Sequence, residues 1–343
     1  MGCLIQIGLL LTLSVLACQA NPHPFLIPPR LQTYNVDPNS LTVSGISSGG
    51  AFATQYHFIY SSEVKGAGIF AGGPYLCGYG GPIDAAACML TPSLISVPWL
   101  ISEANILAAA NQIQPVRHLA DSKVYIFHGF LDTVVDPLGG RKIETMYKHY
   151  GANIAHEFDI GAGHGQPVDG NGFGGPCGQL NILHGFVNEC GYNGAYEMFR
   201  HMYGEDIVRP EPGFVADGEL LDFNQGEFFA IDPIVASMAY KGLIYVPKAC
   251  KDWSKRCRFH VAFHGCMANE HIVGEGFATK TQYNDVAEVN DIIVMYPQTT
   301  STLISPVGCW DWFGYTGLAS FATKWGNQPA AVHKMTKRVM GIN

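Results

Sequence analysis

Short apolar runs alternate along the chain with longer segments in which apolar residues recur at a helical period. The short runs are typical of strands buried on both faces of a sheet, and the longer segments are typical of helices. We expect strands at 41–43, 67–70, 124–127, 154–158, 243–246, 259–263 and 292–296. We expect helices at 51–61, 98–113, 140–150, 281–289 and 330–340. This alternation predicts an α/β fold whose mainly parallel sheet is covered by helices on both faces.

Two stretches depart from the alternation. Residues 165–194 are rich in Gly, Asn and Pro and contain two cysteines, so we expect a loop region held by a disulfide. Residues 209–226 are polar and irregular, a pattern that favours a separation between two lobes.

The first twenty residues carry no charged side chain, and 4–16 form an apolar core. Small residues follow as far as Ala20, which is typical of a secretory signal peptide cleaved after that residue. We therefore expect secretion and a single catalytic domain over 21–343. The apolar run is too short to span a membrane comfortably, and no other segment is long enough. As an alternative, 15–18 resembles a bacterial lipoprotein box, in which Cys18 would be lipidated.

Composition narrows the class of partner. Hydrophobic residues make up 48% of the chain and charged residues 14%, which is typical of a well-buried globular protein. The formal net charge of −8 argues against nucleic acid as a partner. The sequence has no CxxC pair and no nucleotide-binding fingerprint, so we expect no metal and no cofactor. We expect a monomer.

Eight cysteines follow the leader, an even number that suggests disulfides in a secreted chain. Eight cysteines allow 105 connectivities, so the sequence alone leaves the pairing open. Closeness along the chain favours Cys77–Cys88, Cys177–Cys190 and Cys250–Cys257, which leaves Cys266 and Cys309.

A G-x-S-x-G motif follows the first expected strand and precedes the first expected helix. It reads Gly45-Ile46-Ser47-Ser48-Gly49. In this context it is typical of the nucleophile elbow of α/β-hydrolases, a strained turn that exposes the serine at the top of a sheet. The glycines are needed because side chains there would collide with neighbouring backbone.

A serine hydroxyl needs a base, and the base needs an acid that orients it. In α/β-hydrolases these partners follow in the order Ser, Asp, His. Asp132 comes after the strand at 124–127, and the glycine-flanked His164 comes after the strand at 154–158. We therefore predict a triad of Ser47, Asp132 and His164. The weaker candidates are Asp136 for the acid and His128, His156 and His184 for the base.

The position of the elbow is unusual for this fold. About twenty residues of the mature chain precede the strand at 41–43, too few for the earlier strands that normally complete the oxyanion hole. The segments 243–247 and 259–266 form a plausible strand pair, and the second runs into His264-Gly265. We therefore predict a circularly permuted α/β-hydrolase whose first strands come last in the sequence.

Five segments carry a resemblance to the extracellular poly(3-hydroxybutyrate) depolymerases, and they span most of the mature chain. They are residues 45–50, 128–132, 161–164, 263–266 and 308–315. The resemblance implies that Ser47 is the nucleophile, His164 the base and Asp132 its orienter. It also implies an oxyanion hole formed by the N–H groups of Ser48 and Cys266, and it supports a Cys266–Cys309 bridge. The chain looks like the single-domain kind, without a linker or a separate polymer-binding domain.

An aromatic cluster near the C-terminus offers candidates for lining a substrate crevice. Its members are Trp310, Trp312, Phe313 and Tyr315, with Trp325 beyond them, and core packing is the alternative role. Two other functions remain open. A carboxylesterase for feruloyl or acetyl groups would share the triad, and a non-catalytic binding protein would share the fold.

Overall fold

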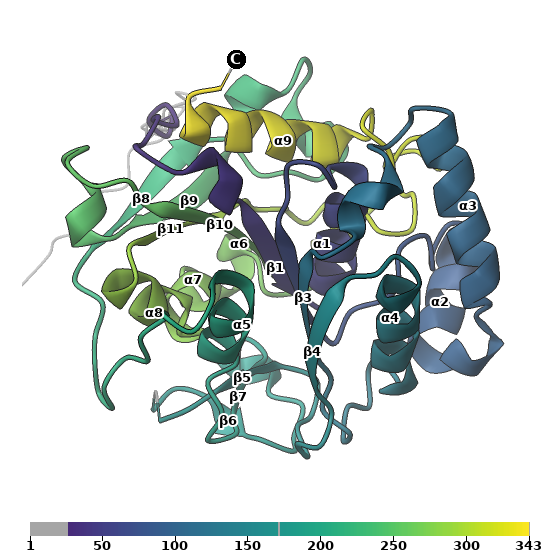
Figure 1. The fold of residues 1–343 in the computed structure, drawn as a ribbon, viewed down its shortest axis with the longest axis horizontal. Coiled ribbons are helices and arrows are strands. Elements are labelled where there is room, and N and C mark those ends of the chain that lie inside the picture. Colours follow the sequence, from purple (N-terminus) through teal and green to yellow (C-terminus); the bar gives the residue numbers. More distant parts are fainter. Residues whose placement is uncertain (1–26, 171, 343) are drawn as a thin grey trace, which may run out of the picture.

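The computed structural model describes residues 27–170 and 172–342, so the expected leader with Cys18 and Ala20 lies outside the described residues. The centre is an eight-stranded sheet in the order β4-β3-β2-β1-β10-β11-β9-β8 (Figure 1). Its strands are β1 (Thr42–Ile46), β2 (Gly66–Phe70), β3 (Lys123–Phe127), β4 (Asn153–Glu157), β8 (Glu219–Asn224), β9 (Lys241–Val246), β10 (Arg258–Phe263) and β11 (Ile292–Tyr296). Strand β9 pairs antiparallel with both neighbours, and the other pairings are parallel.

Helices cover both faces of the sheet, as the apolar pattern predicts (Figure 1). The helices are α1 (Ser48–Ile59), α2 (Pro82–Leu90), α3 (Val97–Ala109), α4 (Leu138–His149), α5 (Gly194–Tyr203), α6 (Glu270–Val273), α7 (Gly276–Lys280), α8 (Tyr283–Val289) and α9 (Asn327–Met340). Residues of α1, α3, α4 and α9 share one buried apolar cluster with the sheet, and residues of α5, α7 and α8 share the other.

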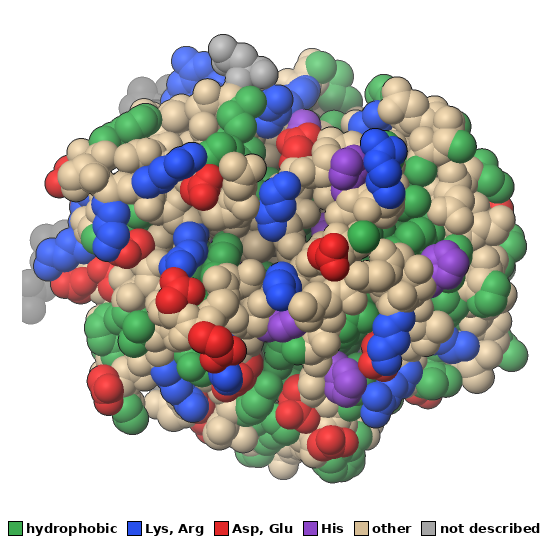
Figure 2. Space-filling view, in the orientation of Figure 1, with side chains coloured by type: hydrophobic (Ala, Val, Ile, Leu, Met, Phe, Trp, Pro, Cys, Tyr) green, Lys and Arg blue, Asp and Glu red, His purple; other side chains and the backbone are tan. Residues whose placement is uncertain are grey.

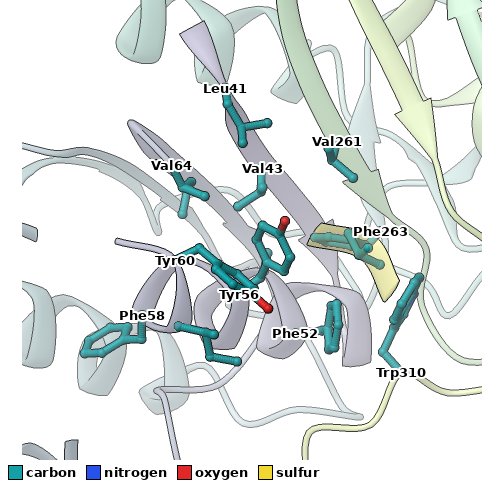
Figure 3. Close-up of a cluster of buried hydrophobic side chains, with 14 of the residues drawn as sticks. Leu41, Val43, Phe52, Tyr56, Phe58, Tyr60, Val64, Val261, Phe263 and Trp310 are labelled. Atoms are coloured by element: carbon teal, nitrogen blue, oxygen red, sulfur yellow. The ribbon is translucent and has the colours of Figure 1, made fainter. Parts of the chain in front are cut away.

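The first cluster is densest around α1. Phe52 and Tyr56 of this helix pack against Phe263 of β10, and Trp310 stacks on Phe52 with ring centroids 4.5 Å apart (Figure 3). Burial of such large rings removes a large apolar area from water and so stabilises this layer.

Strands from opposite ends of the chain meet at the middle of the sheet. Strand β1 pairs in parallel with β10, with Gly45 opposite Phe263. The expected pairing of 243–247 with 259–266 is wrong, because β11 lies between β9 and β10. The fold is a circularly permuted α/β-hydrolase, as the sequence predicts.

The two departures from the alternation have different outcomes. Residues 219–224 do not separate two lobes, because they form β8, which extends the main sheet by pairing with β9. The stretch 165–194 is mostly loop and contains a small sheet of β5 (Gln166–Val168), β7 (Val187–Glu189) and β6 (Gly175–Pro176).

Four disulfides lie within residues 27–342 as far as the structure describes them, and three of these link the pairs favoured by closeness along the chain. They are Cys77–Cys88, Cys177–Cys190, Cys250–Cys257 and Cys266–Cys309. Among the described residues, none of the helices has the length and apolarity needed to cross a membrane. On the face seen in Figure 2, acidic and basic side chains are interspersed.

Candidate active site

Ser47 lies at a sharp turn between β1 and α1. Its backbone has φ 58° and ψ −123°, a left-handed conformation that is strained for a residue with a side chain. The turn is held from both sides, because Ser47 N–H donates to the Phe70 carbonyl and the Ser47 carbonyl accepts from Ala51 N–H. Ser47 is half-buried and lines a small pocket, so its hydroxyl is placed where a ligand can reach it.

The glycines of the motif are required by close backbone approach. A Cβ placed on Gly45 would lie 2.3 Å from the Gly49 carbonyl oxygen. A Cβ on Gly49 would lie 2.3 Å from the carbonyl oxygens of both Phe263 and His264. The first turn of α1 therefore rests directly on the end of β10, as the interpretation of a nucleophile elbow requires.

Asp132 and His164 meet at the same rim of the sheet, beyond the carboxyl ends of β3 and β4. His164 Nδ1–H donates to Asp132 Oδ2 at 2.8 Å, and both side chains are buried. Asp132 Oδ1 accepts from the N–H groups of Val134 and Val135, each at 2.9 Å. Burial raises the pKa of Asp132, but hydrogen bonds from His128 and His164 outweigh it and hold the pKa well below its usual range. The carboxylate is thus ionised and oriented toward His164.

His128 also reaches this carboxylate, which the sequence did not indicate. Its Nε2 lies 3.3 Å from Asp132 Oδ2 and 3.0 Å from the carbonyl oxygen of Val135. The four-residue spacing from Asp132 was the available signal, but the turn that joins the two side chains is formed by tertiary contacts.

The weaker candidates have other surroundings. Asp136 is exposed and its carboxylate accepts from Leu138 N–H at the start of α4. His156 lies 3.2 Å from the Glu144 carboxylate. The ring of His184 lies edge-on to that of Phe173, with centroids 5.9 Å apart.

The loop after β10 also lies against Ser47. A Cβ placed on Gly265 would lie 3.3 Å from Ser47 Cβ, and Cys266 lines the same pocket as Ser47. Ser48 is the first residue of α1, where backbone N–H groups have no partner within the helix. The disulfide to Cys309 fastens the loop.

The aromatic candidates separate into core and pocket. Trp310 is completely buried between Phe52 and Phe263, so its expected place in a crevice is wrong (Figure 3). Trp312 lines the pocket beside Ser47. Tyr315 is held inside its own loop, where its hydroxyl donates to the Cys309 carbonyl.

The chain is similar to known proteins along most of its length. The chain is 36% identical over 315 residues to a poly(3-hydroxybutyrate) depolymerase of Delftia acidovorans, covering 90% of this chain and 61% of that one. It is 33% identical over 326 residues to a polyhydroxybutyrate depolymerase of Talaromyces funiculosus, covering 90% of this chain and 92% of that one. No family model matches the chain.

Two solved structures share the fold. One is a PHB depolymerase from Penicillium funiculosum, with a TM-score of 0.82 and 31% identity. The other is a serine-to-alanine variant of a PHB depolymerase complexed with an R3HB trimer, with a TM-score of 0.82 and 30% identity. Each match covers 92% of this chain and 100% of the solved one. The chain therefore belongs to the polyhydroxybutyrate depolymerase family of serine ester hydrolases.

Proposed function

We propose that this chain is a secreted serine esterase that hydrolyses the ester bonds of poly(3-hydroxybutyrate) or its oligomers. The observation that carries the proposal is the contact of 2.8 Å between His164 Nδ1 and the Asp132 carboxylate, at the same rim as the strained Ser47. The names of the relatives supply the substrate class, and one solved relative holds a trimer of that chemistry.

The mechanism follows from the roles of three side chains. Ser47 Oγ attacks the ester carbonyl while His164 Nε2 takes its proton, and Asp132 stabilises the imidazolium that forms. As the C–O bond breaks, His164 gives this proton to the leaving ester oxygen, so the departing chain ends in a hydroxyl and an acyl group stays on Ser47. Water, activated by His164, releases the acid and restores the serine. The N–H groups of Ser48 and Cys266 bind the oxyanion, worth about 3 kcal/mol per donor.

The surface around the pocket suits an uncharged polyester. Large apolar side chains stand exposed next to residues of the site: Phe130 and Leu131 before Asp132, Leu90 after the pocket residue Met89, and Val307, whose carbonyl accepts from Met267 N–H beside Cys266. Exposed apolar side chains near the site favour contact with an apolar surface or ligand. They support a polymer or an oligomer over a small charged ester.

Secretion is part of the proposal. Four disulfides are typical of proteins that fold in an oxidising compartment, and they fit the leader expected over residues 1–20.

The test is hydrolysis of two substrates by the wild type and by Ser47→Ala. We expect the wild type to clear a poly(3-hydroxybutyrate) suspension and to release 3-hydroxybutyrate from soluble oligomers. We expect Ser47→Ala to lose about 10⁶-fold in kcat on the oligomers, because the nucleophile is gone. Activity confined to aryl or sugar esters would instead support a feruloyl or acetyl esterase. Undiminished hydrolysis by Ser47→Ala would refute the catalytic assignment, and activity on no ester would support a binding protein.

A further inference from the structure

We propose that His264 is a positioning residue, which aims the Cys266 N–H at the oxyanion by holding the preceding Gly265 carbonyl away from Ser47. The inference rests on the proposed function, because it assumes that Ser47 is the nucleophile and that Cys266 N–H is an oxyanion donor.

The hydrogen bonds of His264 define one tautomer. Thr299 N–H points at His264 Nε2 at 3.2 Å, and a backbone N–H can only donate. Nε2 is therefore the acceptor, and the ring proton is on Nδ1. Nδ1 lies 2.7 Å from the Gly265 carbonyl oxygen, to which it donates. Burial lowers the pKa of His264 to about 4, so the ring stays neutral near pH 7 and this arrangement persists.

Because a peptide bond is planar, the bond to the Gly265 carbonyl also fixes the direction of the Cys266 N–H. In a planar trans peptide the C=O and the N–H point in opposite directions. The Gly265 carbonyl is held by two donors, His264 Nδ1–H and Ala268 N–H at 3.2 Å. The N–H of Cys266 belongs to the same peptide, so it is turned away from the His264 ring. Gly265 lies against Ser47, and Cys266 lines the pocket that Ser47 shares.

The turn needs such support because its backbone is strained. Met267 has φ 59°, a left-handed conformation that a side chain disfavours. The turn is fixed at one end by Met267 N–H donating to the Val307 carbonyl and at the other by the disulfide of Cys266. Neither contact bonds the Gly265 carbonyl, whose direction is set by the shorter bond from His264 Nδ1–H at 2.7 Å and the longer one from Ala268 N–H at 3.2 Å.

The chain offers a matched control in the next buried histidine along β10. His260 is also completely buried, and its two ring nitrogens bond the hydroxyls of Thr42 and Ser44 inside the sheet. His260 therefore has the same burial and the same number of partners, but it contacts no part of the oxyanion turn.

The experiment compares kcat, KM and thermal stability of His264→Leu and His260→Leu on a soluble 3-hydroxybutyrate oligomer. We expect both variants to lose thermal stability. We expect His264→Leu to lose about 10²-fold in kcat with KM within twofold, as for loss of one oxyanion donor. We expect His260→Leu to keep kcat within threefold. Equal kcat losses in the two variants, or an unchanged kcat in folded His264→Leu, would overturn the proposal.

Two conservative variants carry the test if His264→Leu does not fold. Asn places an amide where Nδ1 lies and can still donate to Gly265, whereas Gln places one nearer Nε2 and keeps only the Thr299 contact. We expect His264→Asn to exceed His264→Gln in kcat by about tenfold or more. The reverse order would overturn the proposal. Ser47→Ala separates the failures, because an active Ser47→Ala refutes the proposed function, whereas an inactive one with fully active His264 variants refutes only this inference.

Discussion

The two sides of the catalytic rim are built differently. On the side of β3 and β4, the proposed chemistry belongs to side chains, Asp132 and His164, on loops that hydrogen bonds hold together. On the side of β1 and β10, the proposed oxyanion donors are backbone N–H groups, positioned by contacts such as those of Gly49 with the end of β10. The function of the first side therefore depends on the identity of single side-chain atoms. The function of the second side depends on how closely β1, β10 and α1 pack.

The largest effect should come from one atom on the side-chain side. Asp132→Asn keeps the shape but presents an NH₂ group where both His128 and His164 donate, so His164 is driven to the wrong tautomer. We expect kcat to fall about 10⁴-fold, or about 5.5 kcal/mol, with thermal stability nearly unchanged. Asp136→Asn is the control and should keep full activity. A larger loss in the control would move the acid to Asp136.

Low pH should lower the folding stability through three buried histidines. Burial lowers the pKa of His57, His260 and His264 from 6.5 to about 3, 3 and 4. Below pH 6.5 the unfolded chain binds these protons and the folded chain does not, so stability falls as pH falls from about 6.5 toward 4. Three protons correspond to about 4 kcal/mol per pH unit as an upper value.

Urea unfolding at pH 7.5, 6.0 and 5.0 measures this dependence. His260→Gln should remove about one third of the slope. A free energy of unfolding that stays constant between pH 7.5 and 5.0 would show that these histidines are not buried as described.

A single methyl group should disrupt the packing on the backbone side. Gly49→Ala forces the ends of α1 and β10 apart, because two carbonyl oxygens lie 2.3 Å from the new atom. We expect about 3 kcal/mol of lost stability, together with lower kcat in the folded fraction. Gly139→Ala in α4 is the control, since its nearest neighbour lies 3.6 Å away and the stability should not fall. Equal stability of the two variants would contradict the described contact.

The smallest effect should come from the pocket wall that both sides share. Trp312→Ala removes apolar surface beside Ser47, so we expect KM for an oligomer to rise about tenfold, equivalent to about 1.4 kcal/mol, with kcat nearly unchanged. Trp325→Ala removes an exposed ring outside the pocket lining and should leave KM within twofold. A matching rise of KM in both variants would indicate a general surface effect.

The sequence predicted the strands that carry the three side chains better than the edge of the sheet formed by β9 and β8. Ser47, Asp132 and His164 follow strands that apolar runs reveal, so their shared rim could be inferred. Strand β8 was missed because it is an edge strand with exposed polar positions and no apolar run. The pairing of β9 was mispredicted because neighbours along the chain are not neighbours in this sheet.

In the loop that contains Trp310 and Trp312, the sequence could not predict which side chain is buried. Trp310 and Trp312 lie two residues apart in an irregular segment, where no period tells buried from exposed positions. Their separation depends on Asp311, whose carboxylate accepts from Gly314 N–H at 2.6 Å and Thr316 N–H at 2.9 Å and so bends the loop. These hydrogen bonds to a buried carboxylate depend on the packing of the loop against the core, which a sequence pattern does not reveal.

The pairing of β1 with β10 also sets an order of events during synthesis. Thr42 and His260 are hydrogen-bonded partners 218 residues apart, so the nucleophile strand leaves the ribosome long before its neighbour exists. Contacts of such sequence separation form late, because a long loop must close first. A nascent chain therefore carries the proposed nucleophile Ser47 but lacks Cys266, the second proposed oxyanion donor. On the proposed mechanism, esterase activity would then report the completion of the whole fold, because a chain truncated before β10 lacks part of the site.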